Sequence, residues 1–152
     1  MKIFRAGSAI VLSLTAGLAY LLEAGFASFY LEPCTDLAAF GPVSTATCDV
    51  ALVVLDLVWA LAIVIVLFGL LILTLHRFSL VWGTIVIMAS VGGYSGLLVL
   101  VFLTPYSPPL YAQFVFALLF LPALALGVLG GTAGRRWHPV GSTTSTLAKS
   151  NP

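Results

Sequence analysis

The chain has 152 residues, of which 61% are hydrophobic and only 7% are charged, and its formal net charge is +1. A soluble domain carries about 25% charged residues, and so few charges cannot build a water-exposed surface. The composition therefore excludes a soluble enzyme, a nucleic-acid-binding module and a disordered chain. It predicts an integral membrane protein whose surroundings are the lipid bilayer.

Four apolar stretches are long enough to cross a bilayer, whose hydrocarbon core of about 30 Å requires roughly 20 helical residues. Backbone polar groups in lipid need internal partners, so each stretch should be an α-helix. The short connections between the later stretches favour antiparallel neighbours. The predicted fold is an all-α membrane protein, a four-transmembrane-helix antiparallel bundle, with helices at about residues 6–30, 50–75, 78–103 and 110–131.

The first stretch, residues 6–30, contains one charged residue, Glu23, and is preceded by Lys2 and Arg5. Two basic residues followed by an apolar run are also typical of a signal peptide, which would here be cleaved after Ala27. The run is long for a signal peptide, which favours a retained transmembrane helix. The intact mass of the mature protein distinguishes the two interpretations.

Both cysteines of the chain, Cys34 and Cys48, fall in the predicted loop at 31–49. Outside the cytoplasm a cysteine pair is generally oxidised, so we predict a disulfide, worth about 3 kcal/mol in the loop-entropy model. Thiol-redox catalysis in the membrane is a weaker alternative. It would require a Cys-x-x-Cys pair and a second relay pair, and this sequence has neither.

The second and third stretches differ in charge. Residues 50–75 contain Asp56, whereas residues 78–103 contain no charged residue. Gly92 and Gly96, four residues apart in the third stretch, have the spacing that lets helix backbones approach closely. We interpret the glycines as packing positions.

The fourth stretch, residues 110–131, is also uncharged. It repeats the four-residue glycine spacing with Gly127 and Gly131, and Pro122 is expected to kink the helix. The Gly-, Ser- and Thr-rich residues 137–152 are predicted to form a disordered cytoplasmic tail.

The basic residues indicate the orientation of the chain. With four crossings, all six fall on one side: Lys2, Arg5, Arg77, Arg135, Arg136 and Lys149. The positive-inside rule then places both termini in the cytoplasm and the cysteine loop outside. We expect residues 1–136 to form a single domain in the cell membrane, with an outer loop at 31–49.

Glu23 and Asp56 are candidate functional residues because charges inside a membrane helix are costly and rare. Counted inward from the outer helix ends, both should lie about 10 Å deep, at one level with Tyr94 and Ser95. No Lys, Arg or His falls in the four stretches to neutralise them. Three interpretations remain: a protonated pair that fixes helix register, a site for a proton, metal cation or organic cation, and docking of a basic residue from a partner subunit.

The function predicted from these features is a non-enzymatic accessory, assembly or structural subunit of the membrane. Its expected partners are the lipid bilayer and other membrane subunits, or further copies of itself, bound through small-residue helix faces. The alternative is a small proton- or cation-coupled carrier or channel that uses the acidic pair. We find no cluster with metal-ligand spacing and no cofactor motif, so no metal or cofactor is expected.

Overall fold

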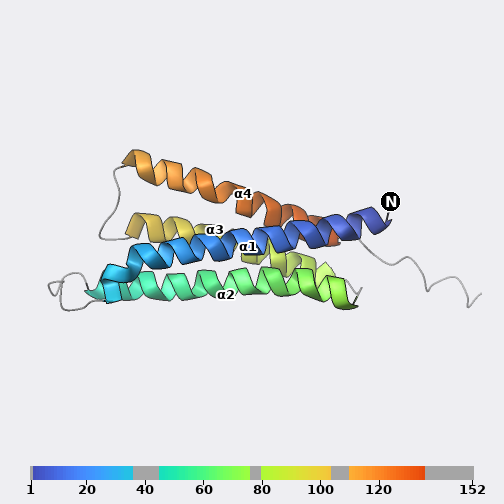
Figure 1. The fold of residues 1–152 in the computed structure, drawn as a ribbon, viewed down its shortest axis with the longest axis horizontal. Helices are drawn as coiled ribbons and strands as arrows, with labels where there is room; N and C mark the ends of the chain where they lie inside the picture. The colour runs from blue at the N-terminus through green and yellow to red at the C-terminus, as the bar shows by residue number, and fades with distance from the viewer. Residues whose placement is uncertain (1, 36–44, 76–79, 104–109, 136–152) are drawn as a thin grey trace, which may run out of the picture.

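A computed structural model describes residues 2–35, 45–75, 80–103 and 110–135 of the chain, and these residues are entirely helical. They form four helices that lie lengthwise beside one another (Figure 1). The helices are α1 (Lys2–Thr35), α2 (Thr45–Leu75), α3 (Leu80–Leu103) and α4 (Leu110–Arg135). The predicted all-helical fold with four long apolar helices is confirmed. The tail predicted at 137–152 lies outside the described residues.

Every helix is long and apolar enough to cross a membrane. The candidate spans are Ile3–Phe29, Ala46–Thr74, Leu80–Phe102 and Gln113–Arg135. Only 28% to 33% of the most apolar window of each span is buried inside the structure. The outward faces therefore carry large apolar side chains such as Leu22, Val53, Met88 and Leu118, all more than half exposed. Such a surface suits lipid better than water.

The helices pack as a ring of four neighbours. α1 packs against α2 and α4, α3 also packs against α2 and α4, and α1 meets α3 only sparingly. Since no helix is enclosed by the other three, each keeps one face toward the outside. This arrangement explains why each helix buries only a stripe of its surface.

Near the start of α1 and the end of α4 the helices meet on small side chains. A Cβ atom added at Gly130 would lie 2.6 Å from Ser13 Oγ, and one added at Gly127 would collide with Ser90 and lie 3.7 Å from Ala16. Ser13, Ala16 and Ser90 are themselves fully buried. We refer to Ser13, Ala16, Ser90, Gly127 and Gly130 as the small-residue junction. It brings α1, α3 and α4 together at backbone distance, as small residues do in membrane helix contacts.

A second set of glycines fixes the register between α1 and α2. Gly17 packs against Val66, and a Cβ atom at Gly69 would lie 2.9 Å from Leu14 Cγ. A step of three residues forward along α1 is thus matched by three residues backward along α2. This register gives the level of every residue on one helix relative to the other.

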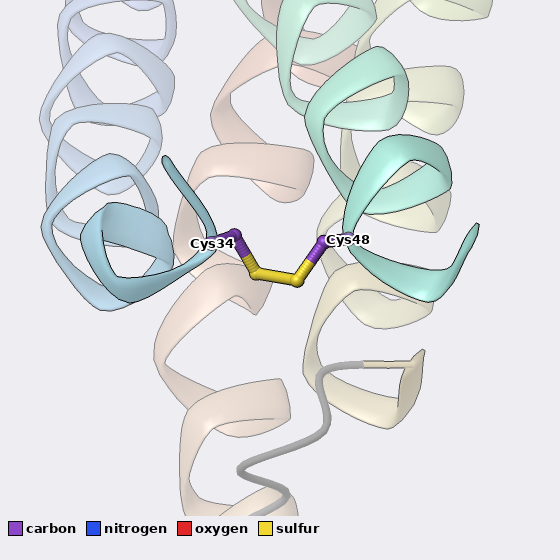
Figure 2. The surroundings of a disulfide bond; sticks show 2 residues. All are labelled: Cys34 and Cys48. Carbon is purple, nitrogen blue, oxygen red and sulfur yellow. A yellow bond between two sulfur atoms is a disulfide. The ribbon is translucent and has the colours of Figure 1, made fainter. Parts of the chain in front are cut away.

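At the other end of the structure, Cys34 and Cys48 form a disulfide between the last turn of α1 and the first turn of α2 (Figure 2). Their Cα atoms are 5.5 Å apart, which is a usual disulfide spacing, and both residues are buried. The predicted disulfide is confirmed. Both cysteines lie in helices rather than in the loop predicted at 31–49, because α1 and α2 continue past their predicted ends. Residues 36–44 of that loop are outside the described residues. We call this end the disulfide end.

Toward the disulfide end, α4 diverges from the other helices (Figure 1). Leu110 and Phe114, at the start of α4, are 69% and 65% exposed. The ring of Phe116 still contacts Phe26 of α1, with ring centroids 6.0 Å apart. The helix continues through Pro122. α4 is therefore tightly packed at the small-residue junction and diverges from the other helices toward the disulfide end.

Candidate functional site

The structure separates the four residues that the sequence groups into one site. Glu23 on α1 and Tyr94 on α3 are half-buried between helices, whereas Asp56 on α2 and Ser95 on α3 are exposed. Glu23 and Tyr94 thus remain together as candidate site residues. Asp56 and Ser95 face outward, and each has to be considered by itself.

The helix register also places the two acids at different levels. Glu23 lies six residues beyond Gly17, so its counterpart on α2 is Ala60, six residues before Val66. Asp56 lies four residues further toward the disulfide end, which is about 6 Å at 1.5 Å per residue. Counting residues inward from the outer helix ends predicts that Glu23 and Asp56 lie at one depth. The helix packing instead places Asp56 about one turn nearer the disulfide end than Glu23.

Rotation about the helix axes separates the acids further. The residues above and below Glu23 on the same face of α1 contact α4: Ala16 lies beside Gly127, and Phe26 contacts Phe116. Glu23 therefore lies on the α4 side of α1. The α2 side of α1 is marked instead by Ser28, whose hydroxyl accepts a hydrogen bond of 3.3 Å from Trp59 Nε1.

Asp56 lies on a different face altogether. The positions three to four residues before and after it, Val53 and Ala60, are exposed, as is Ile63 one turn further along. The neighbouring positions Leu55 and Val58 are buried. Val53, Asp56, Ala60, Ile63 and Leu67 form a stripe along α2 that no other described helix covers, and we call it the Asp56 face.

Two tyrosine hydroxyls, one of them on a residue one turn from Glu23, connect three helices. The Tyr20 hydroxyl donates a buried hydrogen bond of 2.6 Å to the carbonyl oxygen of Ser90 on α3. Its ring packs against Gly93, where an added Cβ atom would lie 3.2 Å from Tyr20 Cε1. The Tyr94 hydroxyl on α3 donates a longer bond of 3.4 Å to the carbonyl oxygen of Ala117 on α4. The two hydroxyls thus link α1 to α3 and α3 to α4.

Glu23 lies one turn from Tyr20 on the same helix. The Oε2 atom of Glu23 is buried and has no hydrogen-bond partner among the described residues. A buried carboxyl oxygen without a partner is costly, so this atom needs an explanation. We call Tyr20, Glu23 and Tyr94 the tyrosine–glutamate site.

The sequence alone assigns no role to Tyr20 or to Ser90. One available signal is the spacing of Tyr20 and Glu23, which places them on one face of a helix. The other is Gly93, which leaves room for an aromatic ring between helices. The bond to the Ser90 carbonyl has no sequence signal, because any residue has a backbone carbonyl.

The described residues contain no group of three or more His, Cys, Asp or Glu side chains placed to hold a metal ion. Comparison with protein-family models, curated proteins and solved structures found no match to this chain. The Asp56 face and the tyrosine–glutamate site are therefore the candidate functional features of the described helices.

Proposed function

We propose that the chain is a multi-pass membrane protein folded as an antiparallel four-helix bundle, with both termini in the cytoplasm and the disulfide end outside. Four candidate spans support insertion into a bilayer. Arg5 and Arg135, near the start of α1 and at the end of α4, are exposed at the end opposite the disulfide. Residues 31–49 contain acidic residues and no Lys or Arg. This distribution supports the orientation that the positive-inside rule gives.

We propose further that the protein is a non-enzymatic accessory or assembly subunit of a membrane complex. The observation that carries this proposal is the exposure of Asp56 on an otherwise apolar face of α2. Asp56 lies seven residues from Asp49, which places it about 10 Å deeper along the helix. An aspartate side chain is too short to reach the headgroups from that depth.

A carboxylate facing lipid at this depth costs about 2.5–3.5 kcal/mol on insertion scales. A transmembrane helix with a Lys or Arg at the matching level would offset this cost by pairing with Asp56. The apolar residues Val53, Ala60 and Ile63 around it would pack against the same partner helix. The Asp56 face is thus suited to a basic partner subunit.

The test is purification of the protein from its native membranes in a mild detergent. The wild-type chain is expected in a stoichiometric complex whose partner has a Lys or Arg within a membrane helix. Asp56→Asn and Asp56→Leu are expected to release the partner while the Cys34–Cys48 disulfide persists. Ser95→Ala is the matched control, since it changes another exposed polar residue, and it should leave the complex intact.

Two results would overturn the accessory role. One is a complex that survives both Asp56 substitutions. The other is a homo-oligomer held through Asp56, because residues 6–75 and 78–134 of this chain contain no Lys, Arg or His to pair with it. A second copy therefore could not supply the expected cation.

A second candidate function is a small proton- or cation-coupled carrier, favoured by the buried, unpartnered Oε2 atom of Glu23. Proton flux into vesicles that contain a pH-sensitive dye tests this function. Glu23→Gln should abolish the flux and Asp56→Asn should not. Vesicles whose flux equals that of protein-free vesicles would exclude it.

The disulfide has no direct part in either proposed function, the accessory subunit or the carrier. Both cysteines are buried, with relative exposures of 5% for Cys34 and 4% for Cys48, and disulfide exchange needs access to a sulfur atom. These observations support a structural role for the disulfide over thiol-redox chemistry.

A further inference from the structure

We propose that the partner of Asp56 is a single transmembrane helix packed on the outer side of the α1–α2 contact, where Gly25 of α1 lets that helix approach closely enough for its Lys or Arg to reach Asp56. The inference rests on the accessory function proposed above. It adds α1 to the surface that the partner covers and names the residue that fixes the approach.

Gly25 is a glycine without a packing role among the described residues. Cβ atoms added at Gly17, Gly69 and Gly93 would each lie against a side chain of a neighbouring helix, whereas one added at Gly25 would meet nothing within 4 Å. A glycine inside a helix is less stable than an alanine, and packing in this bundle does not explain it. The backbone of α1 is thus open to a further helix at Gly25.

A hydrogen bond marks the contact between α1 and α2 near Gly25. Trp59 Nε1 on α2 donates to Ser28 Oγ on α1 over 3.3 Å, and both residues are half-buried. Gly25 lies three residues before Ser28, and Asp56 lies three residues before Trp59. Three residues along a helix leave a rotation of about 60°. Gly25 and Asp56 are therefore each turned about 60° away from this bond.

Both residues are turned toward the outside of the bundle. On α1, Ala16 contacts α4, and Gly25, nine residues further on, lies on the opposite side of the helix. On α2, Val58 lies against Gly96 of α3, and Asp56, two residues before it, is rotated away by about 160°. Gly25 and Asp56 thus lie just outside the α1–α2 contact, on the side away from α3 and α4.

Gly25 and Asp56 also lie at nearly the same level. The packing of Gly17 against Val66 sets the register, so the counterpart of Gly25 on α2 is Val58, eight residues before Val66. Asp56 lies two residues further toward the disulfide end, which is about 3 Å along the helix axis. An open glycine and an exposed carboxylate therefore flank one contact between two helices.

Apolar side chains continue this surface away from the disulfide end. Leu18, seven residues before Gly25, and Ile63, seven residues after Asp56, lie on the same faces of their helices. Their side chains are 57% and 49% exposed. We call Leu18, Gly25, Asp56 and Ile63 the α1–α2 surface.

The occupant that fits the α1–α2 surface is a membrane helix with one cation. Residues 6–75 and 78–134 contain no Lys, Arg or His, so neither this bundle nor a second copy supplies a cation at this depth. An acyl chain has no charge to offer Asp56. A helix in contact with Gly25 would place a Lys or Arg beside Asp56 and pack its apolar side chains against Leu18 and Ile63.

The test measures binding of a defined helix to the full chain in phosphatidylcholine vesicles by energy transfer. The probe is a leucine–alanine transmembrane peptide with one lysine about 10 Å from its outer end, and its twin has leucine at that position. The lysine peptide should bind the wild type about tenfold more tightly than the leucine peptide. Asp56→Leu should remove this preference.

The contribution of α1 is tested by Gly25→Leu. This variant should keep the helix content and thermal stability of the wild type, because an added Cβ atom meets nothing within 4 Å. It should weaken the lysine peptide to the affinity of the leucine peptide. Gly7→Leu is the matched control, since Gly7 is equally open and lies on the same face of α1 about 27 Å away. Gly7→Leu should bind the peptide as the wild type does.

Photo-cross-linking locates the bound peptide. A photoreactive residue at Leu18 or Ile63 should cross-link the lysine peptide. Leu57 is the control position, because it is 55% exposed but lies on the side of α2 toward α3. A photoreactive residue at Leu57 should give little product.

The possible results are distinct. Equal binding of the two peptides shows that lipid or any apolar helix covers the surface and overturns the inference. Unchanged binding to Gly25→Leu, or stronger cross-linking at Leu57 than at Leu18, also overturns it. A native partner that is lost in Asp56→Asn but retained in Gly25→Leu leaves the accessory function standing and overturns only this inference. A native chain that purifies without any partner contradicts the accessory function, whatever the peptides show.

Discussion

The two ends of the bundle hold their helices together by different means. Near Arg5 and Arg135, buried contacts between Gly127, Gly130 and small neighbours bring three helices to backbone distance. Near the disulfide end, a covalent bond connects α1 and α2. Between the two ends, the Tyr20 and Tyr94 hydroxyls donate to carbonyl oxygens of neighbouring helices. The half-buried Glu23 lies near these tyrosines, between the two ends.

This difference shows where chemistry can occur in a protein whose helices are apolar on all sides. Close packing of small residues stabilises a membrane bundle through van der Waals contact. Hydroxyls and a carboxyl can change partners. The tyrosine–glutamate site lies next to the small-residue junction, since Tyr20 donates its hydrogen bond to the carbonyl of Ser90.

The largest effect is expected from removing the disulfide. The double substitution Cys34→Ser and Cys48→Ser should lower the free energy of unfolding by up to about 3 kcal/mol. Hydrogen exchange should increase near the disulfide end of α1 and α2 and stay unchanged around Gly127. Equal increases at both ends would show that the two ends do not behave separately.

The next effect in size concerns the small-residue junction. Gly127→Ala places a Cβ atom 2.7 Å from Ser90 Cβ, and such overpacking should cost about 1–3 kcal/mol. Gly25→Ala is the matched control, because an added Cβ atom there meets nothing within 4 Å. It should be neutral or stabilise α1 by up to about 1 kcal/mol through helix propensity. Detergent unfolding titrations measure both, and similar losses for the two variants would contradict the packing difference.

Much of this architecture could be predicted from the sequence, for a physical reason. The length of an apolar run determines whether it can span a bilayer, so four helices follow directly. Cys34 and Cys48 are the only two cysteines and are predicted on one side of the membrane, so their pairing also follows. Both inferences depend on the order of residues along the chain and on little else.

The relative placement of Glu23 and Asp56 could not be predicted in the same way. Counting from helix ends gives a depth only to within about a turn, because α1 and α2 extend beyond their apolar runs. Rotation is harder still, since a helix that is apolar on every side gives no hydrophobic stripe to orient it. Contacts such as Gly17 with Val66 determine both the depth of a residue relative to its neighbours and the rotation of its helix. These contacts depend on tertiary packing.

A smaller effect should distinguish the two tyrosines of the site. Tyr20→Phe removes a buried bond of 2.6 Å and should cost about 1 kcal/mol. Tyr94→Phe removes a bond of 3.4 Å, which is long for a hydroxyl donor, and should cost less. Thermal unfolding in detergent ranks the two variants. A larger loss for Tyr94→Phe would mean that the α3–α4 connection contributes more stability than the α1–α3 connection.

The smallest effect concerns the other unpartnered polar atom, Ser13 Oγ, which lies in the small-residue junction and is buried without a hydrogen bond among the described residues. Ser13→Ala should raise the free energy of unfolding by about 1 kcal/mol, because it removes an unsatisfied polar group. Ser90→Ala is the matched control. The Ser90 hydroxyl donates a bond of 2.7 Å to the Val86 carbonyl, so its loss should bring no such gain.

The sign of the Ser13→Ala effect bears on how the two unpartnered atoms are interpreted. A gain in stability would show that Ser13 is present for its size, as a small side chain that fits against Gly130. Glu23 is neither small nor fully buried, so packing gives no corresponding reason for its carboxyl group. A loss in stability would instead show that an unpartnered oxygen can be favourable in this bundle through contact alone.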